Sequence, residues 1–185
     1  PAFKITVATE GAFPPFNYLD RKGMPAGFEM ELAQEACQRI KAECDAVINI
    51  STGGSSLMSL DERLAPARLA RPEMCSLNMG TMNFGIFPLQ ERYNEWKHPW
   101  EPRLLDATRR VPFKNSFEDI EMILDDLGRD KGARFEFECY DLGQIETLAY
   151  YLRKGRVKPP LYVQFVLGVL GGVGTSPENL AAMKA

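Results

Sequence analysis

The sequence has few of the residues on which several common kinds of functional site depend. Among its 185 residues there is one histidine, His98, and none of the four cysteines form a Cys-x-x-Cys pair. A zinc site built from several histidines is therefore excluded within this chain, and neither a zinc ribbon nor a thioredoxin-like site is expected. Cys75 and Cys139 lie in apolar runs, where we expect small buried side chains.

The sequence also has no large excess of positive or negative charge and no long apolar run. The 22 basic and 25 acidic residues leave a formal net charge of −3, and the lysines and arginines form no cluster. This balance argues against a nucleic acid partner. The longest apolar run, 161–173, contains Gln164 and three glycines. It is shorter than the roughly 20 residues that span a bilayer, so we expect no membrane partner.

Both ends of the sequence look cut. It opens at Pro1 without a charged and then apolar secretory segment, and it closes at Ala185 soon after a helix start at Ser176 and Pro177. We therefore expect a piece of a longer protein or a recombined chain.

The apolar residues alternate between the spacing of strands and that of helices. Strands are predicted at 4–9, 46–50, 75–79, 135–140 and 161–167, and helices at 28–40, 59–70, 116–128, 144–154 and 177–185. This order predicts an α/β fold with about five mainly parallel strands, as a partial (β/α)8 barrel or an open sheet. The last strand is almost continuously apolar, which predicts cover on both faces. The stretch 84–113 shows no period.

Two carboxylates occupy one face of the predicted strand 135–140. Glu136 and Glu138 alternate with Phe135, Phe137 and Cys139, so the acidic and apolar side chains should point to opposite faces. On a solvent face the two glutamates are an ordinary polar surface. In a barrel lumen they would need a metal ion, a cationic partner or a proton. The residues themselves leave both alternatives open.

From Asp45 onward, several motifs in order resemble the beta-keto acid cleavage enzymes, the family that includes 3-keto-5-aminohexanoate cleavage enzyme. The matching stretches are 45–54, 62–66, 71–74, 76–85, 135–141 and 158–172. The resemblance implies a (β/α)8 barrel fold. It also implies a retro-Claisen exchange in which a β-keto acid and acetyl-CoA give acetoacetate and a new acyl-CoA.

The resemblance also implies roles for particular residues. Glu138 would be catalytic, and a second group would bind substrate: Thr52, Ser55, Asn78 and Thr81. The family's zinc ion (Zn2+) is held by a His-x-His pair and a late glutamate, whereas this chain has no His-x-His pair and ends before the late strands. We therefore expect the zinc ligands to be missing and the chain by itself to be inactive. Gln144 stands where the family often has histidine.

The first 44 residues resemble the opening of periplasmic amino-acid-binding proteins of ABC transporters, at 4–17 and 27–33. This resemblance implies that Glu10 and Phe13 hold the ligand's amino group and side chain. Some of these proteins carry a disulfide spaced like Cys37 and Cys44. We therefore predict a binding-protein-like βα unit at 1–44 and a barrel segment at 45–185, fused into one structural domain.

Three functions remain open at this stage. The chain is a beta-keto acid cleavage enzyme, an engineered or recombined α/β chimera without native activity, or an amino-acid-binding module. An incomplete barrel would expose apolar lumen and unpaired strand edges, so self-association is expected. The expected location is the cytoplasm.

Overall fold

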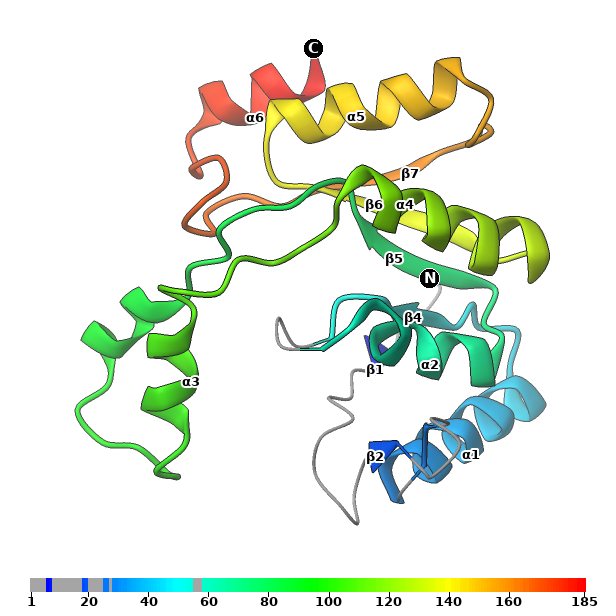
Figure 1. Cartoon of the computed structure of the whole chain (residues 1–185), viewed down its shortest axis with the longest axis horizontal. Helices are drawn as coiled ribbons and strands as arrows, with labels where there is room; N and C mark the ends of the chain where they lie inside the picture. Colours follow the sequence, from blue (N-terminus) through cyan, green and yellow to red (C-terminus); the bar gives the residue numbers. More distant parts are fainter. Residues whose placement is uncertain (1–5, 8–17, 20–24, 27, 55–57) are drawn as a thin grey trace. The chain divides into compact units, whose positions relative to one another are not determined.

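The structure, a computed structural model, describes residues 6–7, 18–19, 25–26, 28–54 and 58–185. Strands and helices alternate along these residues (Figure 1), which confirms the expected α/β class. No helix in these ranges is both long and apolar enough to cross a bilayer.

The main sheet has five strands in the order β1-β4-β5-β6-β7. Their bounds are Thr6–Val7 (β1), Asn49–Ser51 (β4), Met74–Asn78 (β5), Arg134–Cys139 (β6) and Tyr162–Phe165 (β7). The β1–β4 and β4–β5 pairs are parallel, and Ser51 lies opposite Ser76. An antiparallel pair, β2 (Tyr18–Leu19) and β3 (Pro25–Ala26), lies where the sequence predicts only a loop.

The chain forms two compact units, which are described separately. The first contains residues 1–77 and 118–136, and the second contains residues 78–117 and 137–185. One boundary falls near the end of β5 and another within β6, so both strands contribute residues to each unit.

In the first unit, a long helical segment supplies much of the core. Helix α4 (Phe117–Ile123) continues into a π-helical stretch, η2 (Leu124–Asp130). Its apolar face is buried, as its spacing predicts: Ile120, Ile123, Leu124 and Leu127. Gly128 allows close approach of a neighbouring ring, because a Cβ there would come 2.8 Å from Phe135 Cε2.

Helix α2 (Leu60–Ala70) begins with a capping box. The Ser59 hydroxyl accepts the Glu62 N–H at 3.3 Å, and the Glu62 carboxylate accepts the Ser59 N–H at 2.7 Å. Two otherwise unpaired N–H groups are thereby satisfied. Pro66 lies inside α2, and the helix continues through it to Ala70.

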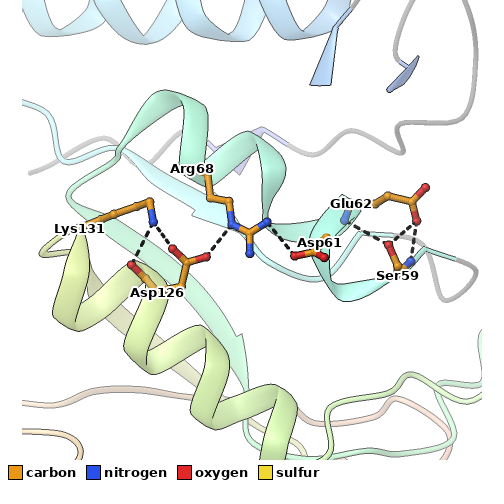
Figure 2. Close-up of polar contacts among 6 residues, drawn as sticks. All are labelled: Ser59, Asp61, Glu62, Arg68, Asp126 and Lys131. Atoms are coloured by element: carbon orange, nitrogen blue, oxygen red, sulfur yellow. Dashed lines mark hydrogen bonds and ion pairs between the residues drawn. The ribbon is translucent and has the colours of Figure 1, made fainter. Parts of the chain in front are cut away.

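A chain of ion pairs joins α2 to η2 within the first unit (Figure 2). The Arg68 guanidinium donates to Asp126 Oδ2 at 2.6 Å and to Asp61 Oδ1 at 2.9 Å. The Lys131 ammonium pairs with the same Asp126 carboxylate. Burial, the largest effect, acts to raise the pKa of Asp126, but the bonds from Lys131 and Arg68 outweigh it, and the net pKa is lowered.

Helix α1 (Phe28–Glu43) bears on the predicted cysteine pairing. Cys44 continues the helical hydrogen bonding, because its N–H bonds to the Ile40 carbonyl at 2.9 Å. Seven residues along a helix rise about 10 Å, whereas disulfide Cα atoms lie within about 7 Å. Both thiols are free in this structure. The pairing of Cys37 with Cys44 would therefore require the last turn of α1 to unwind.

In the second unit, the stretch 84–113 contains two short helices that the sequence did not predict. They are η1 (Phe87–Arg92) and α3 (Glu101–Ala107). The Thr108 hydroxyl accepts the N–H of Phe87 at 3.1 Å, and the Arg109 guanidinium lies 3.8 Å from the Phe87 ring centroid. Helices of six or seven residues are too short to establish an apolar period.

The core of the second unit gathers around Met82, Phe113 and Tyr140, with Phe84, Val166 and Val169 packed against them. Helices α5 (Leu142–Arg153) and α6 (Pro177–Lys184) add buried residues, namely Leu148, Tyr151 and Met183. Ser176 caps α6 as predicted, since its hydroxyl accepts the Asn179 N–H at 3.3 Å.

Strand β7 is not covered on both faces, so that prediction is wrong. Tyr162 and Val163 are 53% and 37% exposed. The strand stands at the end of the described sheet. A continuous apolar run shows only that the residues of the strand are apolar. Whether both faces of the strand are buried depends on which elements pack against them.

Candidate functional site

The strongest candidate site lies in the second unit, where β5 and β6 end. The Tyr140 hydroxyl donates a hydrogen bond of 2.9 Å to Glu138 Oε2. The Asn78 side chain also acts on this hydroxyl, in the direction that lowers its pKa. Met79 N–H donates to the Glu138 carbonyl at 3.0 Å, which fixes the two strand ends side by side. The structure thus brings together the ends of the two strands that carry the predicted residues Asn78 and Glu138.

The Tyr140 hydroxyl is held in its neutral form. Burial raises its pKa most, and the negative charge of Glu138 and the hydrogen bond to that carboxylate raise it further. The Asn78 side chain acts in the opposite direction without reversing the shift. The phenol therefore remains a proton donor to Glu138 at neutral pH.

A second layer of hydrogen bonds supports the end of β5. The Asn115 amide donates to the Asn78 carbonyl at 2.9 Å, and the Asn115 N–H donates to Thr81 Oγ1 at the same distance. Asn115 is buried, whereas Thr81 is exposed. The predicted residue Thr81 is therefore connected to Asn78 through the main chain and side chain of Asn115, a residue that the sequence did not point to.

Gln144 fixes the main chain just after β6. Its Oε1 accepts the Tyr140 N–H at 2.9 Å, and its own N–H donates to the Asp141 carboxylate at 2.8 Å. Asp141 thereby caps helix α5. The lack of a side chain at Gly80 leaves space for the Gln144 side chain, because a Cβ at Gly80 would come 3.2 Å from Gln144 Cγ.

The first unit contains a separate group of buried polar residues. Thr52 is 1% exposed, and its hydroxyl donates to the Ser76 carbonyl at 2.7 Å. Glu136 is 2% exposed and accepts a hydrogen bond from the Asn49 amide. Of the two alternatives for the acidic face of β6, the solvent-facing one is wrong at Glu136, because that carboxylate is buried.

Three of the predicted site residues lie outside the described residues: Ser55, Glu10 and Phe13. Tyr140 and Asn115 are the members of the site that the sequence analysis did not assign. A signal for Tyr140 was present, because it follows Glu136 and Glu138 at a spacing of two and so shares their face of the strand. No such signal exists for Asn115, which lies in an irregular segment.

The zinc ion implied by the family resemblance does not fit the residues that the structure describes. These residues contain no group of three or more histidine, cysteine, aspartate or glutamate side chains suited to a metal ion. His98, the single histidine of the sequence, stacks on Trp100 at 5.8 Å between ring centroids.

Comparison with known proteins places most of the chain in one group. The family model described as beta-keto acid cleavage enzyme matches residues 19–185. A 3,5-dioxohexanoate:acetyl-CoA acetone transferase of Paraburkholderia graminis is 54% identical over 151 residues, which cover 82% of this chain and 48% of that protein. A 3-keto-5-aminohexanoate cleavage enzyme of Acetoanaerobium sticklandii is 32% identical over 145 residues, 76% of this chain and 43% of that protein. The chain spans about half the length of these curated relatives.

A second, shorter similarity is of another kind. An octopine-binding periplasmic protein of Rhizobium meliloti is 46% identical over 43 residues, which cover 23% of this chain and 15% of that protein. Each of the two groups that the sequence resembles therefore includes a known protein that is similar to part of this chain.

Proposed function

The chain belongs to the beta-keto acid cleavage enzyme family, and on that premise we propose that it supplies substrate-binding and catalytic groups for the exchange of a β-keto acid with acetyl-CoA. In this reaction the bond between C2 and C3 of the β-keto acid breaks. C2, with its carboxylate, joins the acetyl carbonyl to give acetoacetate. The CoA thiolate leaves the acetyl group and joins the C3 acyl group, which gives the new acyl-CoA, so that atoms and charges balance.

Glu138 is the catalytic residue in this proposal. Its carboxylate is half-buried at the end of β6 and is oriented by the Tyr140 hydroxyl. A carboxylate at this position can accept and return a proton while the bonds at C2 change. The ends of parallel strands are also where α/β proteins bind their ligands.

The other predicted residues position the substrate. Asn78 offers its side-chain amide, and Thr81 offers an exposed hydroxyl beside it. We also propose Thr52 and Ser55, which follow β4 in the sequence, as substrate-binding residues. The observation that carries the proposal is the hydrogen bond from the Tyr140 hydroxyl to the Glu138 carboxylate, at the place where Met79 N–H, next to Asn78, donates to the Glu138 carbonyl.

Production of acetoacetate tests the proposal. The full chain is incubated with acetyl-CoA and 3,5-dioxohexanoate, the substrate in the name of the relative that is 54% identical, and separately with 3-keto-5-aminohexanoate. Because the family's zinc ligands are missing from this chain, acetoacetate and the new acyl-CoA should appear, in equal amounts, only if the groups of this chain suffice for the exchange. Glu138→Gln should abolish both products, and the exposed Glu146→Gln is the matched control that should leave them unchanged.

Absence of both products from the wild-type chain would count against an activity of this chain by itself. Equal rates for wild type and Glu138→Gln would remove Glu138 from the proposal.

The proposed co-substrate, acetyl-CoA, is consistent with the expected cytoplasmic location. Self-association is proposed because the apolar residues of β7 are exposed, and sedimentation at several protein concentrations tests it.

A second candidate function rests on the similarity to the octopine-binding protein. In this alternative, residues 1–44 are a binding-protein-like unit joined to a barrel segment at 45–185, and Glu10 and Phe13 contact an amino acid. Calorimetric titration with octopine tests it. Heat of binding that is lost in Glu10→Gln would support it, and no binding at millimolar ligand would contradict it.

A further inference from the structure

Several contacts hold the backbone and the ring of Tyr140 in place. Its N–H donates to Gln144 Oε1 at 2.9 Å, and its carbonyl accepts the Val173 N–H at 2.8 Å. Gly172 lies so close that a Cβ there would come 2.6 Å from the Tyr140 carbonyl oxygen. The Phe84 ring packs edge-on at 5.6 Å between centroids. With backbone and ring both held, the hydroxyl has a defined position.

We propose that Tyr140 is a positioning residue for Glu138, an inference that rests on the proposed function of Glu138. The hydroxyl donates to Glu138 Oε2 at 2.9 Å. A donor on one carboxylate oxygen restricts rotation of the carboxyl group and stabilises its charged form. The other oxygen is then presented in one orientation for the substrate.

The same arrangement predicts how Tyr140 and Glu138 influence one another. A hydrogen bond to a charged group contributes enough to shift a protonation equilibrium by about one pH unit. Removing the hydroxyl should therefore make the Glu138 carboxylate easier to protonate. Tyr140→Phe removes that hydroxyl and keeps the ring that packs against Phe84.

The first test follows the Glu138 side-chain carboxyl by carbon-13 NMR in the full chain, from pH 7 downward. Its resonance is assigned by its loss in Glu138→Gln. In Tyr140→Phe the midpoint should move to higher pH by about one unit. Tyr151→Phe is the matched control, because Tyr151 is 1% exposed and its hydroxyl donates to the Phe117 carbonyl at 3.3 Å. The control should leave the Glu138 midpoint where it is.

A double-mutant cycle supplies a second measurement at pH 7, where the fold does not have to withstand acid. Tyr140→Phe should lower the equilibrium constant for folding about tenfold in the wild-type background. It should have little effect in the Glu138→Leu background, which lacks the acceptor. Tyr151→Phe should have the same effect in both backgrounds.

An unchanged Glu138 midpoint in Tyr140→Phe, or an equal effect of Tyr140→Phe in both backgrounds, would overturn the proposal. Neither readout requires turnover. A moved midpoint without acetoacetate formation would therefore retain the positioning role and reject the proposed activity. Where acetoacetate forms, Tyr140→Phe should lower kcat and move the acid limb of its pH profile upward, while KM changes little.

Discussion

The Asn49 amide donates a hydrogen bond to the Glu136 carboxylate, and both side chains are 2% exposed. Asn49 comes from β4 and Glu136 from β6, and β5 lies between these strands in the sheet. The bond therefore spans the middle strand and ties its two neighbours together. A buried carboxylate needs such donors because it has left water.

Loss of this donor should be costly. We expect Asn49→Ala to lower the free energy of unfolding by about 2 kcal/mol, because a buried charge loses a hydrogen bond. Asn94→Ala, at an exposed position, is the control and should stay within about 0.5 kcal/mol of wild type. Urea denaturation measures both. Equal values for the two variants would show that Glu136 does not depend on Asn49.

The capping box of α2 should make stability depend on pH. Hydrogen bonds from the Ser59 side chain and backbone lower the pKa of Glu62 below its usual 4.5. A lowered pKa stabilises the fold above the usual value, and this stabilisation is lost as the pH falls through the lower, folded-state pKa. Ser59→Ala should cost about 1 kcal/mol at pH 7 and less in acid.

Denaturation by urea at pH 7 and below pH 4 measures this difference. Glu62→Gln is the companion variant, because its side chain carries no charge at either pH. In the Glu62→Gln background the cost of Ser59→Ala should no longer vary with pH. A cost that varies equally in both backgrounds would assign the pH dependence to another group.

The Asp126 ion pairs should respond to acid in the same direction. The pKa of Asp126 is lowered, so its contribution is present above the usual aspartate value of 3.8 and is lost as the pH falls through the folded-state pKa. Asp126→Asn should cost about 1 kcal/mol at pH 7. Asp125→Asn, which affects the more exposed pair with Arg129, should cost less. Thermal unfolding at pH 7 compares the two, and the reverse order would contradict the prediction.

Two glycines with positive φ should differ sharply when replaced by alanine. Gly171 has a φ of +112°, and a Cβ there would come 1.8 Å from the Asn83 carbonyl oxygen. Gly171→Ala should cost more than about 3 kcal/mol or prevent folding. Gly155 has a φ of +68° and no atom within 4 Å of the added Cβ, so Gly155→Ala should cost about 1 kcal/mol. Similar stability costs for Gly171→Ala and Gly155→Ala would mean that the main chain near Asn83 shifts to accommodate the added Cβ.

Part of the candidate site was visible in the sequence. Glu138 and Asn78 were assigned through the family resemblance, and strand alternation placed Glu138 on the face opposite Phe137. The same alternation placed Tyr140 on the face of Glu138, but the sequence did not indicate a role for Tyr140. Asn115 had no periodic or motif signal, because it acts through one amide bonded to a carbonyl far away in the chain.

The sequence by itself determined the features that depend on neighbours within about four residues. These include the Ser59–Glu62 capping box and the apolar stripe of α4, because capping and helical periodicity are local. The tertiary structure decided what depends on distant residues. It buried Glu136 beside Asn49, placed the Tyr140 hydroxyl on the Glu138 carboxylate and left β7 exposed. Burial and hydrogen bonding between strands depend on which elements become neighbours, and apolar spacing does not specify those neighbours.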